Sequence, residues 1–289
     1  MNEKSDIRTL AVIMACHNRR EHTLSSLSAI TRQNLDRELA IEVYLLDDGS
    51  TDGTSEAVAN EFPQVHILEG DGTLYWNRGM HKSFAAAIQQ GFDYYLWLND
   101  DSILYPHALK ILLDTHTDLK KQGNECAIIG SAMQDPVTGK FTYGGVKRHG
   151  SRFGRVRLER IAPGDSPIPC DATNGNCVLL PDSVVKRVGN LDPVYQHRAG
   201  DHDYCFRALQ KGCSVWLAPG YLGTCTENPI EGTWEDVNLP MMERLRRLNS
   251  PHGYRFHEYA IYLRRHRGSW WPAHLIWPYI KILLQSFKF

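Results

Sequence analysis

Three adjacent polar residues, Asn99, Asp100 and Asp101, directly follow an uninterrupted apolar run. This run, residues 94–98 (YYLWL), predicts a strand buried on both faces of an α/β sheet, and ligands of such sheets bind beyond the carboxyl ends of the strands. Two neighbouring carboxylates repel each other unless a cation neutralises them, and oxygen ligands of this kind suit Mg²⁺ or Mn²⁺. The alternative is a polar turn in which Asp101 or Ser102 caps the next helix.

A second acidic pair, Asp47 and Asp48, ends the apolar run of residues 41–46. At the end of a strand these carboxylates could accept hydrogen bonds from a pyrimidine imide or from ribose hydroxyls. The alternative is that residues 47–53 (DDGSTDG) form only a turn with a helix N-cap. No glycine-rich phosphate loop follows the first strand, which disfavours a dehydrogenase, a P-loop enzyme and a nucleotidylyltransferase.

These carboxylates require a sheet that brings the ends of several strands together. Apolar runs alternate with segments of helical spacing through the first hundred residues, which predicts a mostly parallel sheet with helices on both faces. The predicted strands of this half are residues 9–15, 41–46, 65–68 and 94–98.

The second half of the chain has a less regular pattern. Residues 147–160, which are rich in Arg and Gly and have no clear period, predict a mobile loop over the site. Helices are predicted to begin at Pro181 and at Gly200. The predicted strands of this half are residues 127–133, 141–146, 177–180 and 215–218.

Composition places the chain among soluble globular proteins. Of its 289 residues, 42% are hydrophobic and 22% are charged, which is ordinary for that class. The first residues contain no apolar run that would serve as a signal peptide. The seven cysteines form no C-x-x-C pair, so we expect reduced thiols and a cytoplasmic location.

The C-terminal segment is basic and aromatic. From residue 243 onward there are nine Lys or Arg against two Glu. Pro272, Pro278 and Lys281 interrupt its last apolar stretch, so we do not expect a membrane-spanning helix. Basic residues beside Trp and Tyr favour an interfacial segment on an anionic membrane leaflet. The alternative is a pair of amphipathic helices packed on the domain or on a second subunit of a homodimer.

Three of these segments together resemble family-two glycosyltransferases. They are a strand followed by residues 16–20 (CHNRR), a strand followed by residues 47–54 (DDGSTDGT), and a strand followed by residues 99–101 (NDD). The resemblance covers about residues 9–219 and implies the GT-A fold, a Rossmann-like mixed sheet flanked by helices. Together with the basic, aromatic composition of the tail, it leads us to expect a domain of residues 1–222 and a C-terminal helical extension of residues 223–289. Within the domain, residues 1–101 would bind the nucleotide and residues 102–222 the acceptor.

The resemblance also implies roles for the acidic residues near the donor. Asp48 would contact the base or ribose of a nucleoside-diphosphate sugar, with Asp47 assisting. Asp101, with Asn99, would hold a Mg²⁺ or Mn²⁺ ion that bridges the donor diphosphate, and this ion would neutralise charge on the leaving group. Asp100 would contact the ribose or the water shell of the metal.

Asp201, within residues 199–208 (AGDHDYCFRA), is similar to the acidic motif that opens a helix in that family. By the resemblance it is the general base, which takes the proton from the acceptor hydroxyl and so inverts the anomeric configuration. A helix N-terminus positions such a carboxylate and keeps it ionised. Asp203 would lie near the acceptor and is the alternative base, and Arg207 would pair with one of the two carboxylates. The alternative for Asp201 is a simple helix cap.

Residues 70–79 (GDGTLYWNRG) resemble a segment of bacterial rhamnosyltransferases of surface polysaccharide assembly, such as that of O-antigen in the cell envelope. Trp76 and Arg78 would then lie against the donor sugar and its diphosphate, although Trp76 could equally belong to the core. Asn174 and Gly175 match a turn that lines the acceptor pocket in the family.

The sequence departs from the family pattern at three places. Asn99 replaces the usual first Asp of the metal motif, and Gly200 replaces the usual Glu before the base. No His that would complete the metal site is evident near residues 223–227, which leaves the third ligand open.

We therefore expect an inverting, metal-dependent glycosyltransferase at the cytoplasmic face of the membrane. It would move a sugar, with L-rhamnose favoured by the resemblance, from a dTDP- or UDP-linked donor to a polysaccharide or lipid-linked acceptor, and would bind no nucleic acid. The alternatives are a catalytically inactive scaffold subunit that binds a nucleotide sugar and a sugar nucleotidylyltransferase.

Overall fold

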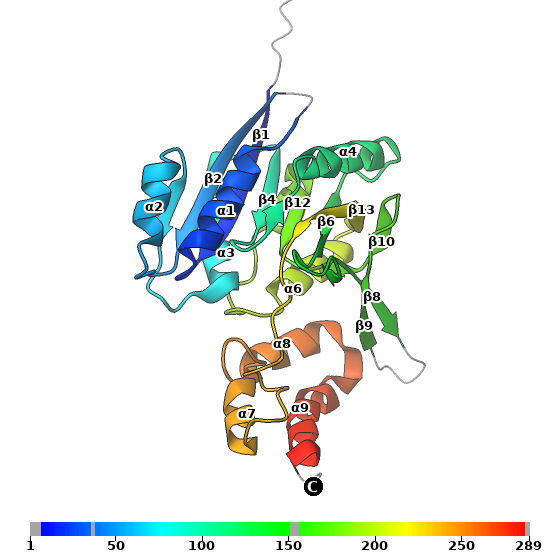
Figure 1. Cartoon of the computed structure of the whole chain (residues 1–289). Helices are drawn as coiled ribbons and strands as arrows, with labels where there is room; N and C mark the ends of the chain where they lie inside the picture. The colour runs from blue at the N-terminus through cyan, green and yellow to red at the C-terminus, as the bar shows by residue number, and fades with distance from the viewer. Residues whose placement is uncertain (1–6, 36–37, 151–155, 287–289) are drawn as a thin grey trace, which may run out of the picture.

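The computed structural model describes residues 7–35, 38–150 and 156–286, and a ten-stranded mixed sheet forms its centre (Figure 1). The strand order is β10-β13-β6-β12-β4-β1-β2-β3, with β5 added to β13 and β7 added to β6. The strands of this sheet are β1 (Arg8–Cys16), β2 (Leu39–Asp47), β3 (His66–Glu69), β4 (Tyr94–Leu98), β5 (Ile103–Leu104), β6 (Ala127–Gln134), β7 (Phe141–Tyr143), β10 (Ile168–Cys170), β12 (Cys177–Pro181) and β13 (Ser214–Thr224).

Parallel pairing in the first half of the sheet places the predicted site residues at one edge. β1 pairs in parallel with β2 and with β4, and β2 pairs in parallel with β3. Cys16 at the end of β1 is in register with Asp47 at the end of β2. The loops after β1, β2 and β4 therefore meet, as the sequence predicted. β12 then runs antiparallel between β4 and β6, which makes the sheet mixed.

Helices cover both faces of the sheet, and each face has its own apolar core. Alternate residues of β4 point to opposite sides: Tyr95 and Trp97 pack under α3, α5 and α6, whereas Leu96 and Leu98 pack under α1, α2 and α4. This alternation explains why the strand is apolar throughout. The helices of the two layers are α1 (Arg20–Thr31), α2 (Thr54–Glu61), α3 (Tyr75–Gln90), α4 (Ala108–Lys121), α5 (Asp182–Val188) and α6 (Gly200–Gln210).

The predicted loop over the site is instead a pair of antiparallel strands. β8 (Gly145–Gly150) pairs with β9 (Val156–Ile161), and β11 (Ala172–Thr173) joins β8 to complete a three-stranded sheet. Residues 151–155 lie outside the described residues. Cross-strand hydrogen bonds hold β8 and β9 together despite their polar, basic sequences, because ladder formation does not require an apolar period. The predicted strand 141–146 likewise divides between β7 and β8, and α5 begins one residue after Pro181.

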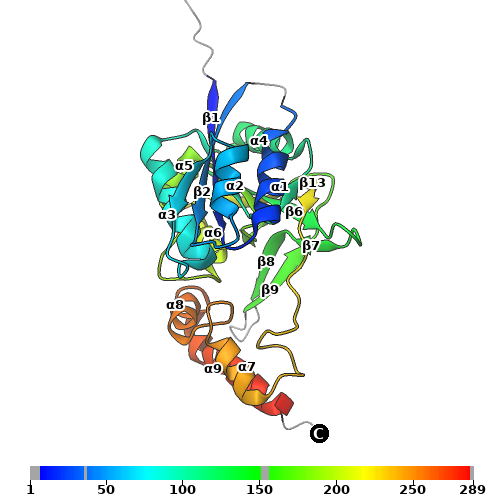
Figure 2. The same cartoon turned by 60° about the vertical axis from the view of Figure 1, so that its left-hand side comes forward.

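The C-terminal extension is helical and lies at one end of the molecule, below α6 (Figures 1 and 2). Strand β13 crosses the predicted domain boundary at residue 222 and ends at Thr224. Among the described residues, no helix combines the length and apolar character needed to cross a bilayer. The helices of the extension are α7 (Met241–Leu248), α8 (Phe256–His266), the short 3₁₀ helix Gly268–Trp270 and α9 (Trp271–Ser286).

Candidate active site

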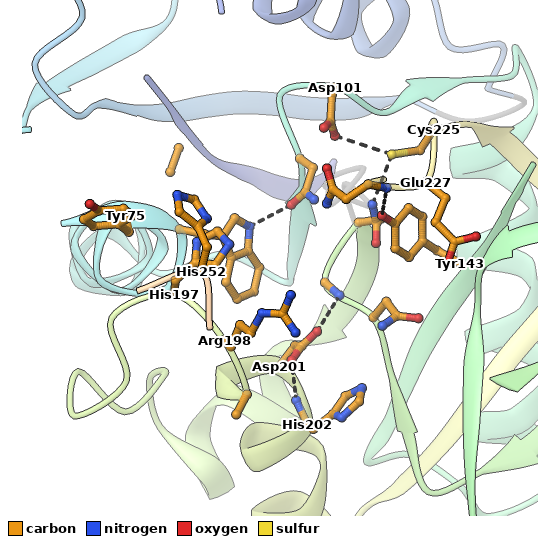
Figure 3. Close-up of a pocket in the computed structure, with 18 of the residues that line it drawn as sticks. Tyr75, Asp101, Tyr143, His197, Arg198, Asp201, His202, Cys225, Glu227 and His252 are labelled. Atoms are coloured by element: carbon orange, nitrogen blue, oxygen red, sulfur yellow. Dashed lines mark hydrogen bonds between the residues drawn. The ribbon is translucent and has the colours of Figure 1, made fainter. Parts of the chain in front are cut away.

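A cavity of about 890 Å³ opens at the carboxyl ends of β1, β2 and β4 and reaches the C-terminal extension (Figure 3). It is lined by eight of the eleven residues that the sequence predicted for the site. These eight residues are Asp48, Trp76, Asn99, Asp100, Asp101, Asn174, Gly175 and Asp201. The other three, Asp47, Arg78 and Asp203, are not among the residues that line it.

Asp48 fastens the loop that precedes α3. Its Oδ1 accepts a hydrogen bond from the backbone N–H of Gly72 at 2.9 Å, and its Oδ2 accepts from those of Leu74 and Tyr75 at 2.9 Å each. A Cβ at Gly70 would lie 2.5 Å from Asp48 Oδ1, so only glycine allows this approach. The hydrogen bonds of Asp48 thus join two segments that are separate in the sequence, residues 47–53 and residues 70–79.

Asp47 and Arg78 do not line the cavity. Asp47 is buried, and its carboxylate accepts hydrogen bonds from the backbone N–H of Ser50 at 2.9 Å and from the hydroxyl of Ser55. Arg78 donates from Nε to the carbonyl oxygen of Pro193 at 2.9 Å. The contacts of both residues stabilise loops, so the structure gives no support to their predicted contacts with the donor.

Arg19, which the sequence interpretation did not single out, faces the predicted metal-binding residues. Its Nη1 lies 2.6 Å from Asp101 Oδ2 and 3.3 Å from Asp100 Oδ1. Burial raises the pKa of the Asp100 carboxyl to about 7, and the charge of Arg19 opposes that shift. The sulfur of Cys225, after β13, lies 3.5 Å from Asp101 Oδ1. Its position in the loop after β1 could have pointed to this role, because β1 is the parallel neighbour of β4 and the loops after the two strands therefore meet.

The oxygen atoms at this edge fit a divalent cation that is shared with a substrate. Asp100 and Asp101 offer two carboxylates, and Mg²⁺ sites commonly combine one or two carboxylates with substrate phosphates and water. No cluster of three His, Cys, Asp or Glu side chains suited to a metal occurs in the described ranges. Asn99 Oδ1 accepts a hydrogen bond from Trp76 Nε1 at 2.7 Å, which commits it to the indole.

Asp201 lies in the first turn of α6, across the cavity from the metal-motif residues (Figure 3). Its Oδ2 accepts a hydrogen bond from the backbone N–H of Gly175 at 3.1 Å, and its Oδ1 accepts from that of His202 at 2.8 Å. A Cβ at Gly175 would lie 2.4 Å from the indole of Trp76, so the turn packs directly on that ring. Asn174 in the same turn accepts a hydrogen bond from the backbone of Gly144 at 3.3 Å.

The packing of Asn77 explains why Gly200 replaces the usual Glu. A Cβ at Gly200 would lie 1.7 Å from Asn77 Oδ1, which leaves no room for a side chain. Asn77 is fully buried and donates hydrogen bonds to the carbonyl oxygens of Asp192 at 2.8 Å and Tyr195 at 2.7 Å. The backbone of Gly200 at the start of α6 therefore packs directly on the side chain of Asn77 in α3.

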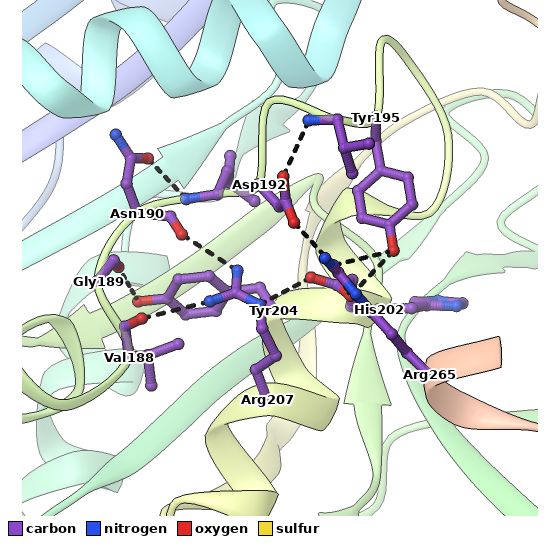
Figure 4. A network of polar contacts seen from close by, with 12 residues as sticks. Val188, Gly189, Asn190, Asp192, Tyr195, His202, Tyr204, Arg207 and Arg265 are labelled. Carbon is purple, nitrogen blue, oxygen red and sulfur yellow. Dashed lines mark hydrogen bonds and ion pairs between the residues drawn. The ribbon is translucent and has the colours of Figure 1, made fainter. Parts of the chain in front are cut away.

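Asp203 is buried and does not line the cavity. It belongs to a polar network that links α6 to α8, and Figure 4 shows the part of this network around Arg207 and Arg265. Its carboxylate contacts Arg207 Nε at 2.7 Å, His266 Nε2 at 2.9 Å, Tyr195 Oη at 3.0 Å and Arg265 Nη1 at 3.2 Å. Burial alone would raise the pKa of Asp203, but the hydrogen bonds from His266 and Arg207 outweigh it and lower that pKa to about 2. The predicted pairing of Arg207 is confirmed, and a contact of Asp203 with the acceptor is not supported.

His197, Arg198 and His252 also line the cavity, and no sequence motif pointed to them. The ring centroids of His197 and His252 lie 4.5 Å apart. Burial, followed by the charges nearby, lowers the pKa of His197 to about 3, so this imidazole is neutral at physiological pH. Tyr75 packs its ring 5.3 Å from that of His252, which closes the side of the cavity formed by the extension.

Comparison with known proteins agrees with this geometry. Residues 11–172, more than half of the chain, match the model of glycosyl transferase family 2. The chain belongs to that family. Similar proteins include the N-acetylglucosaminyl-diphospho-decaprenol L-rhamnosyltransferases of two strains of Mycobacterium tuberculosis, which are 25% identical over 222 residues, or 68% of this chain and 67% of theirs.

A solved structure with a similar fold is that of GalNAc-T7 with UDP, GalNAc and Mn²⁺. It aligns with a TM-score of 0.54 and 13% sequence identity over 91% of this glycosyltransferase. The alignment spans 59% of the length of GalNAc-T7, and at this identity the likeness concerns the fold. The predicted GT-A architecture and the predicted enzyme class, glycosyltransferase, are confirmed.

Proposed function

We propose that this glycosyltransferase transfers L-rhamnose from a nucleoside-diphosphate donor to a lipid-linked glycan, with inversion at the anomeric carbon. The observation that carries the proposal is the position of Asp201, which faces the same cavity as Asp48, Asp100 and Asp101. One side of the cavity thus suits a nucleoside diphosphate, and the other presents a carboxylate suited to a general base.

The donor side would hold the nucleotide and its diphosphate. Asp48 orders the loop that leads to Trp76, and both residues line the cavity, where the Trp76 ring would lie against the donor sugar. Asp101 and Asp100 would hold a Mg²⁺ or Mn²⁺ ion, which supplies charge neutralisation for the departing diphosphate. Arg19 already contacts both carboxylates and would orient them or pair with phosphate oxygens, because a guanidinium suits both.

Asp201 would remove the proton from the acceptor hydroxyl. Its two backbone hydrogen bonds, from Gly175 and His202, hold the carboxylate in place at the amino end of α6. Attack from this side, opposite the leaving group, replaces the anomeric bond in one displacement and inverts its configuration.

The sugar and acceptor are inferred from the relatives. The names of the mycobacterial relatives specify an L-rhamnosyltransferase and a sugar diphospho-lipid acceptor. The resemblance of residues 70–79 to rhamnosyltransferases favours a dTDP-linked donor over a UDP-linked one. Gly200 does not favour the alternative of a catalytically inactive scaffold, because Asn77 occupies the space that a side chain at position 200 would need.

We also propose that the enzyme is cytoplasmic and binds the inner face of the cell membrane through α9. One face of this helix exposes Ile276, Trp277, Ile280, Leu283 and Leu284, each at least 40% accessible. Such an apolar face in a basic segment suits the interface of an anionic leaflet, where a lipid-linked acceptor resides. Burial of the same face in a homodimer is the competing outcome.

The test combines donor binding with turnover. Calorimetry with dTDP, UDP and GDP, each with Mn²⁺ and with EDTA, should show metal-dependent binding of one pyrimidine diphosphate. Asp201→Asn should retain that binding but lose about 10²- to 10⁴-fold in turnover, whereas Asp114→Asn on exposed α4 should match the wild type. Normal turnover of Asp201→Asn would refute the assignment of the base, and absence of nucleotide binding would refute the transferase mechanism.

A further inference from the structure

The side of the cavity formed by the C-terminal extension is a row of tyrosine rings. Tyr254 and Tyr259 stack with centroids 4.4 Å apart and an interplanar angle of 22°. Tyr259 and Tyr262 follow at 6.4 Å and 13°. All three rings line the cavity, and Tyr254 and Tyr259 remain partly accessible. Because the rings stack on one another, the row presents ring edges to the cavity, and together they form an apolar wall against which a sugar ring can pack.

Arg198 adds a positive charge beside these rings. Its Cζ lies 5.4 Å from the centroid of Tyr254, and Figure 3 shows its side chain between His197 and Asp201. The residue is exposed and lines the cavity, and it has no ion pair with any described residue. Its guanidinium is therefore available to an anionic ligand, for which it offers paired donors.

The backbone that carries Arg198 is fixed from two sides. The N–H of Gln196 donates to Glu258 Oε2 in α8 at 3.1 Å, and the carbonyl of Gln196 accepts from the N–H of Asn77 in α3 at 3.1 Å. Ala199 then adopts a left-handed conformation with φ of 73° and turns the chain into α6. These constraints hold Arg198 three residues before the proposed base, Asp201.

We propose that Arg198, Tyr254 and Tyr259 form an acceptor subsite for a sugar linked through diphosphate to a lipid. The sugar would pack against the edges of the stacked tyrosine rings with a hydroxyl toward Asp201, and Arg198 would bind the diphosphate. This inference rests on the proposed function and adds to it the residues that recognise the acceptor.

Position favours the acceptor over the donor as the source of that diphosphate. The donor aspartates already have their own arginine, Arg19, in direct contact. Arg198 lies instead on a tyrosine of the extension, the part of the chain that also carries the exposed apolar face of α9. A lipid-linked substrate would approach from that side.

Steady-state kinetics with two acceptors test the role of Arg198. One acceptor carries N-acetylglucosamine on a short alkyl diphosphate, and the other carries the same sugar and alkyl chain without phosphate. Arg198→Ala should raise the KM for the diphosphate acceptor by about 10- to 100-fold, as expected for loss of a charged hydrogen bond. The KM values for the donor and for the phosphate-free acceptor should change less than about twofold. Arg246→Ala, on the exposed face of α7, is the matched control.

A second pair of variants tests the aromatic rings. Tyr254→Ala should raise the KM for both acceptors by roughly 3- to 10-fold, whereas Tyr254→Phe, which keeps the ring, should resemble the wild type. Hydrolysis of the donor in the absence of acceptor should be unchanged in both variants, which also shows that they are folded. An increase in donor KM, or equal effects of Arg198→Ala on both acceptors, would overturn the subsite. If the wild type transfers sugar to neither acceptor, the proposed function itself fails.

Discussion

Arg19 Nη1 lies 2.6 Å from Asp101 Oδ2, so an arginine pairs with the carboxylate that the sequence predicted as a metal ligand. Arg19 comes from the loop after β1, and Asp101 from the loop after β4, which is the parallel neighbour of β1. The single positive charge of the guanidinium offsets part of the repulsion between these two adjacent carboxylates. A divalent cation at this edge would have to compete with that charge.

Replacement of Arg19 by Ala should therefore strengthen the binding of Mn²⁺ in the absence of nucleotide. Without the guanidinium, Asp100 and Asp101 present uncompensated negative charge to the cation. Calorimetric titration with Mn²⁺ alone should show an affinity higher by about 10-fold, the effect of roughly one unit charge near a partly exposed site. Arg20→Ala, at the exposed neighbouring position, should match the wild type. Unchanged or weaker Mn²⁺ binding in Arg19→Ala would exclude this competition.

A methyl group at Gly200 should destabilise the enzyme. Its Cβ would lie 1.7 Å from Asn77 Oδ1, and overpacking of this kind costs about 1 to 3 kcal/mol. Urea unfolding of Gly200→Ala should show this loss. Gly150→Ala is the control, because no heavy atom lies within 4 Å of the added Cβ there. Equal stability of Gly200→Ala and the wild type would contradict the close packing of α6 against α3.

Asp203→Asn should lower the free energy of unfolding by about 3 kcal/mol at pH 7, because it removes one partner from a buried ion-pair network. The pKa of Asp203 is lowered from 3.8 to about 2 in the folded protein. A lowered folded-state pKa gives stability that is complete above the unfolded pKa and is lost as the pH falls toward the folded one.

The stability difference between wild type and Asp203→Asn should accordingly be constant from pH 7 to about pH 5 and shrink between about pH 4 and pH 2. Denaturant unfolding at each pH measures it. Asp118→Asn, whose carboxylate is 63% exposed, should differ from the wild type by less than about 0.5 kcal/mol throughout. A difference that persisted to pH 2 would mean that the charge of Asp203 is not what the network stabilises.

The exposed apolar face of α9 should bind vesicles that contain anionic phosphatidylglycerol. Trp277 and Leu284 are 54% and 58% accessible, and each would bury its side chain in the interface. Trp277→Glu and Leu284→Glu should each weaken vesicle binding by about 10-fold or more in a sedimentation assay. Val137→Glu, at a 90% accessible position distant from α9 in the sequence, should have no effect on vesicle binding. Loss of a dimer in the α9 variants, without any vesicle binding by the wild type, would assign this face to a second subunit instead.

The sequence was most informative where local pattern and function coincide. The buried strand of residues 94–98 and the acidic loop after it were predicted because a strand covered on both faces must be apolar throughout. The C-terminal helices were predicted from composition alone, whereas their role as one wall of the cavity was not. The sequence pattern did not predict β8 and β9 within residues 147–160, because these strands are stabilised by pairing with each other rather than by an apolar period.

The site itself divides in the same way. By itself, the sequence determined which strand ends carry carboxylates, and hence the family, the fold and the positions of Asp48, Asp101 and Asp201. Only the tertiary structure decided which of the acidic residues face the cavity: Asp203 is two residues from Asp201, yet it is buried against Arg265 and His266 of a distant helix. The physical reason is that a carboxylate takes its role from its partners, and partners from remote elements are set by packing rather than by spacing along the chain.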